Sequence, residues 1–175
     1  SATKRPDSVI GLHFFSPAHV MRLLEIVRGE KTGSAVIATS MKLAGKLRKI
    51  GELSANQYGF IGNRMMDPYG REAERMLLEG ATPRQIDDAL ERFGMAMGIL
   101  AVFDLAGVDV GYKIRQERQA FLPDDPSFYR ASALLVEHGT LGQKSGSGYY
   151  RYEPGSRERF DNPEALRMFA DEAKR

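Results

Sequence analysis

The chain contains no cysteine and no tryptophan, and only three of its 175 residues are histidine. The absence of cysteine excludes disulfides and thiolate metal sites, although it does not identify a cellular compartment. The three histidines form no HxxxH or similar cluster, which argues against a zinc site. We therefore predict that the chain has no metal centre.

Long apolar runs and long charged runs are also missing. No stretch approaches the apolar length of about eighteen residues that a membrane-spanning helix requires, and no signal-peptide pattern is present, so we expect a soluble protein. Lysine and arginine together number 25 and aspartate and glutamate 23, which leaves a net charge of only +2. This weak field does not indicate nucleic-acid binding.

The composition does provide for a core, since 42% of the residues are hydrophobic and 27% are charged. The length indicates one large domain or a domain with an appendage. Residues 9–15 and 21–27 are predicted to be strands, because β-branched and aromatic residues favour that conformation. Ser16-Pro17 interrupts the apolar run between them.

One histidine and one carboxylate lie inside these apolar strands. His13 ends the first strand and Glu25 lies late in the second, so a cross-strand contact is expected; a buried carboxylate is costly unless it is paired. Such a pair would fix the imidazole tautomer and make the other ring nitrogen a directed proton acceptor. Spacing alone leaves a second interpretation, in which His13 is an ordinary core residue and Glu25 is solvated.

The rest of the chain is predicted to be mainly helical. Ser34 and Gly51 are expected to begin and follow the first helix. Thr82 and Gln85 form a capping-box pattern with Pro83 at the first helical position. The expected helices cover residues 34–50, 58–79 (with Pro68 inside), 82–93, 126–138 and two segments that begin near Gly107 and Asn162, and a short strand is expected at 149–152.

Two polar features of these helices each have two interpretations. Asn63 lies on a face of small residues, where its amide either caps a neighbouring backbone or donates to a carbonyl in a site. The later part of the first helix is basic, which indicates either a solvated face favoured by the helix dipole or a site for a phosphate-bearing ligand. The basic residues are Lys42, Lys46, Arg48 and Lys49.

The segment from His13 to Glu25, HFFSPAHVMRLLE, resembles the L-3-hydroxyacyl-CoA dehydrogenase family, for which an HFF-(N/S)-P…LLE pattern is highly specific. Within that family it is most similar to the multifunctional β-oxidation enzymes, which fuse an enoyl-CoA hydratase to the dehydrogenase. The resemblance covers roughly residues 9–152 and continues, in register, through residues 58–64, 94–98, 104–109 and 141–149.

The resemblance implies roles for five residues. His13 would be the general base that takes the hydroxyl proton while a hydride leaves C3 for NAD⁺, and Glu25 would orient it and support its imidazolium form. Asn63 would bind the oxygens of an acyl-CoA substrate, and Ser16 would contact substrate or cofactor at a position where many members have asparagine. Lys144 would approach the nicotinamide cofactor.

The implied fold is mainly α: a helical 3-hydroxyacyl-CoA dehydrogenase C-terminal domain preceded by the last strands of a truncated Rossmann-type sheet. We accordingly expect residues 1–30 to be the tail end of the NAD-binding domain, 31–152 the helical domain, and 153–175 a linker and the start of a further helical segment. No Gly-x-Gly-x-x-Gly turn precedes a helix. NAD would then be bound mainly by an N-terminal domain outside the chain, and the chain alone is expected to be inactive.

Two other functions compete with this one. The chain could be an assembly module without activity, which forms a homodimer through its helices or packs with a second helical domain of the same parent. It could also belong to another 2- or 3-hydroxyacid dehydrogenase, although the His13–Glu25 pair argues against that. The expected location is cytoplasmic for a bacterial protein and peroxisomal or mitochondrial for a eukaryotic one.

Overall fold

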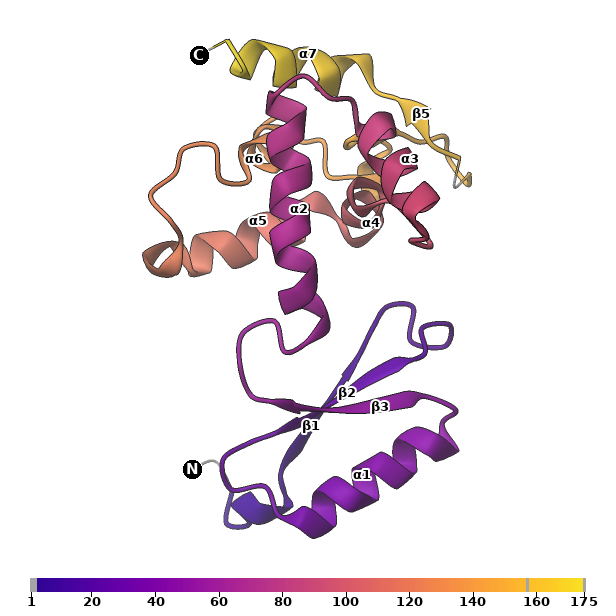
Figure 1. Cartoon of the computed structure of the whole chain (residues 1–175), viewed down its shortest axis with the longest axis vertical. Coiled ribbons are helices and arrows are strands. Elements are labelled where there is room, and N and C mark those ends of the chain that lie inside the picture. Colours follow the sequence, from indigo (N-terminus) through magenta and orange to yellow (C-terminus); the bar gives the residue numbers. More distant parts are fainter. Residues whose placement is uncertain (1–2, 157, 175) are drawn as a thin grey trace. The chain divides into compact units, whose positions relative to one another are not determined.

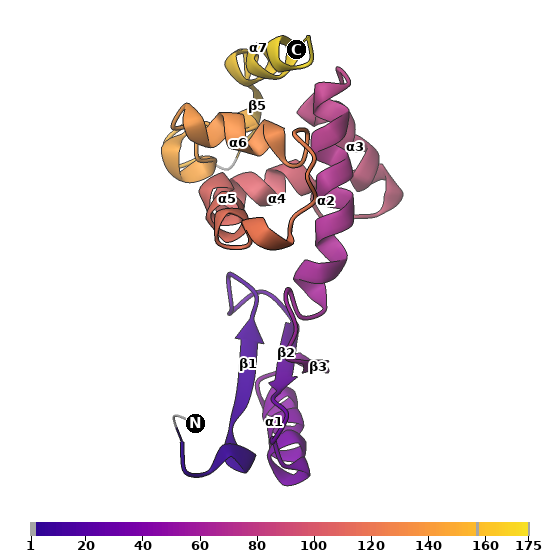
Figure 2. The same ribbon diagram turned by 90° about the vertical axis from the view of Figure 1, so that its left-hand side faces the viewer.

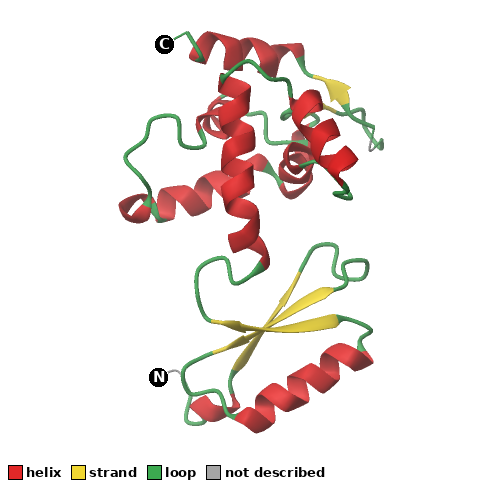
Figure 3. Cartoon of the chain, viewed as in Figure 1, coloured by secondary structure: helices red, strands yellow, loops and turns green. Residues whose placement is uncertain are grey.

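The structure, a computed structural model, describes residues 3–156 and 158–174. The chain forms two compact units, Ser1–Asp67 and Pro68–Arg175. The first contains a small sheet with one long helix beside it, and the second is almost entirely helical (Figure 3). Among the described residues, no helix is both long and apolar enough to cross a membrane.

The sheet of the first unit has three strands in the order β1-β2-β3 (Figure 1). β1 pairs with β2 in antiparallel fashion, and β3 runs parallel to β2. The central strand is the most buried of the three, because it has a neighbour on each side. The bounds are β1 Ile10–Phe14, β2 Leu23–Arg28 and β3 Ile50–Ala55.

Helix α1 (Ser34–Lys46) connects β2 to β3 and packs beside them (Figure 2). Its Ala44 joins Leu24 and Ile26 in the core. A Cβ added at Gly51 would lie 2.8 Å from the Cβ of Ala44, so glycine allows the helix to approach β3 closely. The sequence predicted that Gly51 follows the last turn of this helix. In the structure, Gly51 is instead a residue of β3.

The division of the chain differs from the expected one. The first unit extends through Asp67, not only to residue 30, because α1 and β3 complete the sheet that β1 and β2 begin. A parallel partner needs a crossover connection, and α1 provides it within this chain. The central strand β2 thus has a neighbour on each side within this chain.

The second unit confirms the predicted mainly helical fold. Thr82 and Gln85 form the expected capping box, and α3 ends at Gly94, whose φ of 119° is left-handed. Helix α2 begins in the first unit and continues into the second. The helices are α2 Gly62–Leu78, α3 Pro83–Phe93, α4 Ile99–Ala106, α5 Val108–Glu117, α6 Arg130–Glu137 and α7 Pro163–Glu172, with short 3₁₀ turns at Pro6–Ser8, Gln119–Phe121 and Gln143–Ser145.

The C-terminal segment also differs from the expected linker. Strands β4 (Tyr150–Arg151) and β5 (Phe160–Asp161) pair in antiparallel fashion. The buried Phe169 of α7 lies 6.2 Å from the ring of Tyr149, centroid to centroid. Because this segment contributes to the core, it belongs to the second unit.

Candidate active site

His13 and Glu25 occupy directly opposed positions on β1 and β2. Side chains at paired positions of antiparallel strands lie on the same face of a sheet. The Nδ1 atom of His13 is 2.6 Å from Oε2 of Glu25. The Glu25 side chain is fully buried, whereas that of His13 remains 33% exposed. The predicted cross-strand contact is therefore present, with the imidazole on the solvent side of the carboxylate.

The second oxygen of Glu25 is held by the backbone at the start of α2. Oε1 accepts hydrogen bonds from the amide of Ile61 at 2.9 Å and from that of Gly62 at 2.7 Å. The first amides of a helix have no partner within the helix and lie at its positive end, so they favour a carboxylate. Glu25 thus binds His13 with one oxygen and α2 with the other.

The turn before α2 directs these amides toward Glu25. Gly59 and Phe60 both have left-handed backbone conformations, with φ of 71° and 45°. The amide of Arg64 closes the turn by donating to the carbonyl of Gly59 at 3.0 Å. A non-glycine residue with positive φ is uncommon and strained, and such residues concentrate at functional sites.

Glu25 remains a carboxylate despite its burial. Burial raises the pKa of Glu25, whereas hydrogen bonds from Gly62, His13 and Ile61 lower it. The lowering is the larger effect, so the pKa lies below its usual value. A carboxylate can only accept a hydrogen bond, and Nδ1 of His13 must therefore carry the proton. In the neutral ring, Nε2 then has the free lone pair and can accept a proton.

Aromatic rings flank the imidazole. The ring centroids of Phe15 and Phe60 lie 4.8 Å and 5.4 Å from that of His13. A Cβ added at Gly62 would lie 2.7 Å from Cζ of Phe15, so a side chain at this position would displace the Phe15 ring that packs on His13. In this arrangement the imidazole of His13 is oriented by Glu25, lies between two aromatic rings and can accept a proton at Nε2.

The other predicted site residues have different positions. Ser16 is exposed in the loop that follows β1, and Asn63 is exposed in the first turn of α2, next to Gly62. Both belong to the same unit as His13 and Glu25. Lys144 belongs to the second unit, where its ammonium forms an ion pair with Asp109 of α5.

Sequence reasoning did not identify the amides of Ile61 and Gly62 as part of the site. The segment from Tyr58 to Arg64 was recognised, but only Asn63 was assigned a role. The sequence does contain a signal, since two glycines separated by two apolar residues lie at the start of the predicted helix there. Every residue except proline has a backbone amide, so a sequence does not show which amides bind a side chain. Here the structure shows it, because β2 brings Glu25 to this turn.

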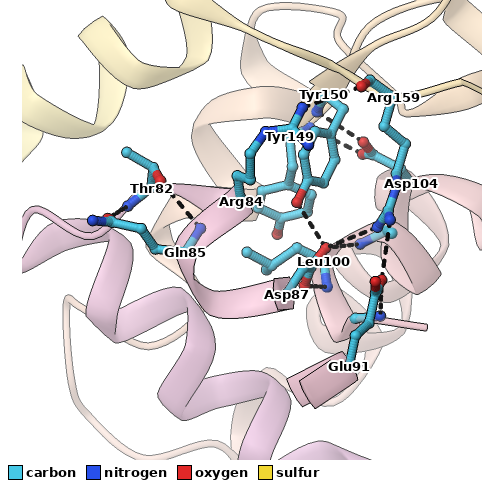
Figure 4. A network of polar contacts seen from close by, with 12 residues as sticks. Thr82, Arg84, Gln85, Asp87, Glu91, Leu100, Asp104, Tyr149, Tyr150 and Arg159 are labelled. Carbon is cyan, nitrogen blue, oxygen red and sulfur yellow. Dashed lines mark hydrogen bonds and ion pairs between the residues drawn. The ribbon is translucent and has the colours of Figure 1, made fainter. Parts of the chain in front are cut away.

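A second polar cluster was also missed, in the helical unit (Figure 4). Asp104 of α4 accepts hydrogen bonds from the amides of Tyr149 and Tyr150 and from the hydroxyl of Tyr152, at 2.9 to 3.0 Å. Burial raises the pKa of Asp104 to about 7, although these three hydrogen bonds lower it. A Cβ at Gly148 would overlap with this carboxylate, which explains why the segment 141–149 has a glycine at this position.

Asp87 of α3 has a similar structural role. Its two oxygens accept from the amides of Leu100 and Ala101, at 3.0 and 2.9 Å, near the start of α4. The hydroxyl of Tyr150 donates to it at 2.9 Å, as Figure 4 shows. Since these buried acids bind backbone amides and tyrosines, they connect α3, α4 and β4.

Comparison with known proteins gives two family matches. Residues 59–152 match the 3-hydroxyacyl-CoA dehydrogenase, C-terminal domain, and residues 1–52 match the 3-hydroxyacyl-CoA dehydrogenase, NAD binding domain. The chain is 46% identical over 165 residues to the peroxisomal bifunctional enzyme of Danio rerio, covering 87% of this chain and 23% of that protein. It is 34% identical over 174 residues to the fatty acid oxidation complex subunit alpha of Acinetobacter baumannii, covering 97% and 24%.

Solved structures agree with these matches. A 3-hydroxybutyryl-CoA dehydrogenase from Escherichia coli is 38% identical with a TM-score of 0.78, covering 90% of this chain and 34% of that one. An (S)-3-hydroxybutyryl-CoA dehydrogenase from Ralstonia eutropha is 34% identical with a TM-score of 0.77, covering 86% and 54%. The chain spans about a quarter of the length of the curated relatives it matches. The match to the C-terminal domain alone covers more than half of the residues of the chain. The chain therefore belongs to the 3-hydroxyacyl-CoA dehydrogenase family.

Proposed function

We propose that the chain supplies the proton-transfer pair of an NAD-dependent L-3-hydroxyacyl-CoA dehydrogenase of fatty-acid β-oxidation. The observation that carries this proposal is the 2.6 Å contact between His13 Nδ1 and Glu25 Oε2, with the same carboxylate held by two backbone amides. The names of the relatives support both the reaction and its place in fatty-acid oxidation.

In the oxidation direction, Nε2 of His13 accepts the proton of the 3-hydroxyl group as the C3–H bond breaks and the C3 carbonyl forms. NAD⁺, when bound, supplies the acceptor for the hydride that leaves C3. Glu25 keeps the imidazole in the required tautomer and stabilises the imidazolium that proton transfer creates. In the reduction direction, the same imidazolium returns the proton to the oxygen.

The residues of this chain fit the proton-transfer half of the reaction. His13 is partly exposed, and its Nδ1 is occupied by Glu25, so Nε2 is the nitrogen available to a substrate. Ser16 and Asn63, both exposed, would bind the substrate, and Lys144 would contact the cofactor. The sequence has no Gly-x-Gly-x-x-Gly turn before a helix, so the phosphates of the dinucleotide would be held elsewhere in the full enzyme.

Oxidation of NADH with acetoacetyl-CoA tests this function. We would measure it for the chain alone and for a chimaera in which the chain replaces the segment that it matches in the Danio rerio enzyme. We expect activity only in the chimaera, and a loss of kcat of about 10²- to 10⁴-fold for His13→Gln. His138→Gln, in the helical unit, is the matched control. Near-normal turnover of His13→Gln would remove His13 from the mechanism.

A second candidate function is self-association through the helical unit. The observation that favours it is an apolar groove of about 630 Å³ between α2 and α3, lined in part by Met76, Ile86 and Leu90. A second copy of the chain would cover this surface. Sedimentation should show a dimer that Ala89→Glu, in the groove, dissociates and Ala120→Glu, outside it, does not. A monomer at micromolar concentrations would contradict this function and favour a groove covered by another domain of the same parent.

The cellular compartment would depend on the kind of organism that produces the protein. We propose a cytoplasmic location in a bacterium and a peroxisomal or mitochondrial one in a eukaryote. One group of relatives is called peroxisomal, which supports the peroxisomal location, and the other group comes from bacteria.

A further inference from the structure

The loop that joins the two strands of the His13–Glu25 pair has no buried side chains. Residues 16–22 are all exposed. Within the loop, the carbonyl of Pro17 accepts from the amides of Val20 and Met21, each at 3.0 Å. A loop without an apolar anchor depends on polar contacts for its conformation. The loop carries Ser16 and directly follows Phe15, which packs on the His13 ring.

The side chain of Lys49 provides such contacts from outside the loop. Its Nζ atom donates to the carbonyl of Ala18 at 2.5 Å and to that of Met21 at 2.6 Å. The acceptors are two backbone carbonyls and not a carboxylate. An ammonium group has three donors and forms charge-assisted hydrogen bonds, which are stronger than neutral ones. One side chain therefore joins both halves of the loop.

The backbone around Lys49 is shaped for this contact. Arg48, which follows the last turn of α1, has a left-handed φ of 56°, a conformation that usually requires glycine. The amide of Arg48 donates to the carbonyl of Gly45 at 3.0 Å, and that of Lys49 to the carbonyl of Ala44 at 2.9 Å. These bonds end the helix and send the chain back toward the sheet, where the amide of Ile50 donates to the carbonyl of Arg22 at 2.8 Å. Lys49 thus faces the loop from a fixed position.

We propose that Lys49 is a positioning residue of the active site, whose ammonium holds the loop 16–22 so that Phe15 keeps its place beside His13 and Ser16 its place in the loop. This inference rests on the proposed function. It also assigns Lys49 a role different from the two considered for the basic residues of this region, a solvated face and a phosphate site. The ligand affected would be the acyl-CoA or dinucleotide that meets the loop at Ser16.

Amide hydrogen exchange on the chain itself tests the loop contact without any activity measurement. In Lys49→Met, we expect exchange at Val20 and Met21 to become about ten times faster or more, with exchange in β2 unchanged. Lys46→Met removes an exposed lysine of α1 and is the matched control. Unchanged exchange at Val20 and Met21 would overturn the inference. If Lys49→Met does not fold, Lys49→Gln replaces it and should show a smaller increase.

The positioning role requires a kinetic consequence in the chimaera. Lys49→Met should raise KM for acetoacetyl-CoA or NADH more than it lowers kcat, because the base itself is untouched, and Lys49→Arg should restore most of the loss. Faster exchange without any change in KM or kcat would leave Lys49 a structural residue only and overturn the proposal. Failure of the His13→Gln test, by contrast, would refute the proposed function while the exchange result stands.

Discussion

The amide nitrogen of Gly62 lies 2.7 Å from Oε1 of Glu25, so the first residue of α2 donates directly to the carboxylate that holds His13. The two residues are 37 positions apart in the chain. The orientation of the imidazole therefore depends on a helix end as well as on the strand pairing.

Replacing Glu25 with glutamine should impair catalysis and change the pH dependence of stability. Glutamine removes the negative charge that fixes the Nδ1 proton, so kcat of the chimaera should fall by about 10²-fold or more. Nitrogen NMR of His13 should show a mixture of tautomers in place of one. A single retained tautomer with normal kcat would contradict the role of Glu25.

The pKa of Glu25 lies below its usual value in the folded state, so its contribution to stability is present above the unfolded-state pKa. That contribution is lost as the pH falls through the lower, folded-state pKa. Plots of the free energy of unfolding against pH should therefore be flatter below about pH 4.5 for Glu25→Gln than for the unaltered chain. Glu30→Gln, at an exposed position, is the control.

Replacing Gly62 with alanine should destabilise the first unit by about 1–3 kcal/mol, because the new Cβ would lie 2.7 Å from Cζ of Phe15. Gly45→Ala is the matched control, since its Cβ would meet nothing within 4 Å on the exposed surface of the last turn of α1. That substitution should stabilise the chain by about 0.5–1 kcal/mol. Chemical denaturation measures both, and equal effects of the two alanines would refute the steric argument.

Asp104 should titrate at a higher pH than an ordinary aspartate. Burial raises its pKa to about 7, so the ¹³C signal of its carboxyl group should move with a midpoint near that pH, compared with about 4 for unperturbed aspartate. The folded state then binds more protons than the unfolded state between these values, and stability should fall as the pH rises from about 4 to 7. Asp104→Asn should make this slope shallower without abolishing it, because burial also raises the pKa values of Asp87 and Glu74, whereas Asp124→Asn should leave the slope unchanged.

The capping box of α3 should contribute measurably to the stability of the helical unit. The hydroxyl of Thr82 accepts from the amide of Gln85 at 3.2 Å, and the Gln85 side chain accepts from the amide of Thr82 at 2.9 Å. Thr82→Ala should cost about 1 kcal/mol, and Thr82→Ser much less, because serine keeps the acceptor. Thermal unfolding of both variants tests this, and an equal loss for serine would show that the methyl group matters instead.

The sequence by itself determined the features that depend on near neighbours. The β-branched and aromatic residues on either side of Ser16-Pro17 predicted β1 and β2, and the places of His13 and Glu25 in them predicted the cross-strand contact that the structure contains. The Thr82 capping box and the helix that begins at Pro163 were likewise predicted, since caps involve residues three positions apart. The family resemblance, carried by the same strand pair, came from the sequence as well.

Only the tertiary structure decided which distant groups meet. It placed the amides of Ile61 and Gly62 on Glu25, made residues 50–55 the third strand of the sheet, and brought the backbone of Tyr149 and Tyr150 to Asp104. The physical reason is that every backbone segment carries the same donors and acceptors. Which of them a buried carboxylate or lysine binds depends on packing across tens of residues, and neither periodicity nor spacing records that choice.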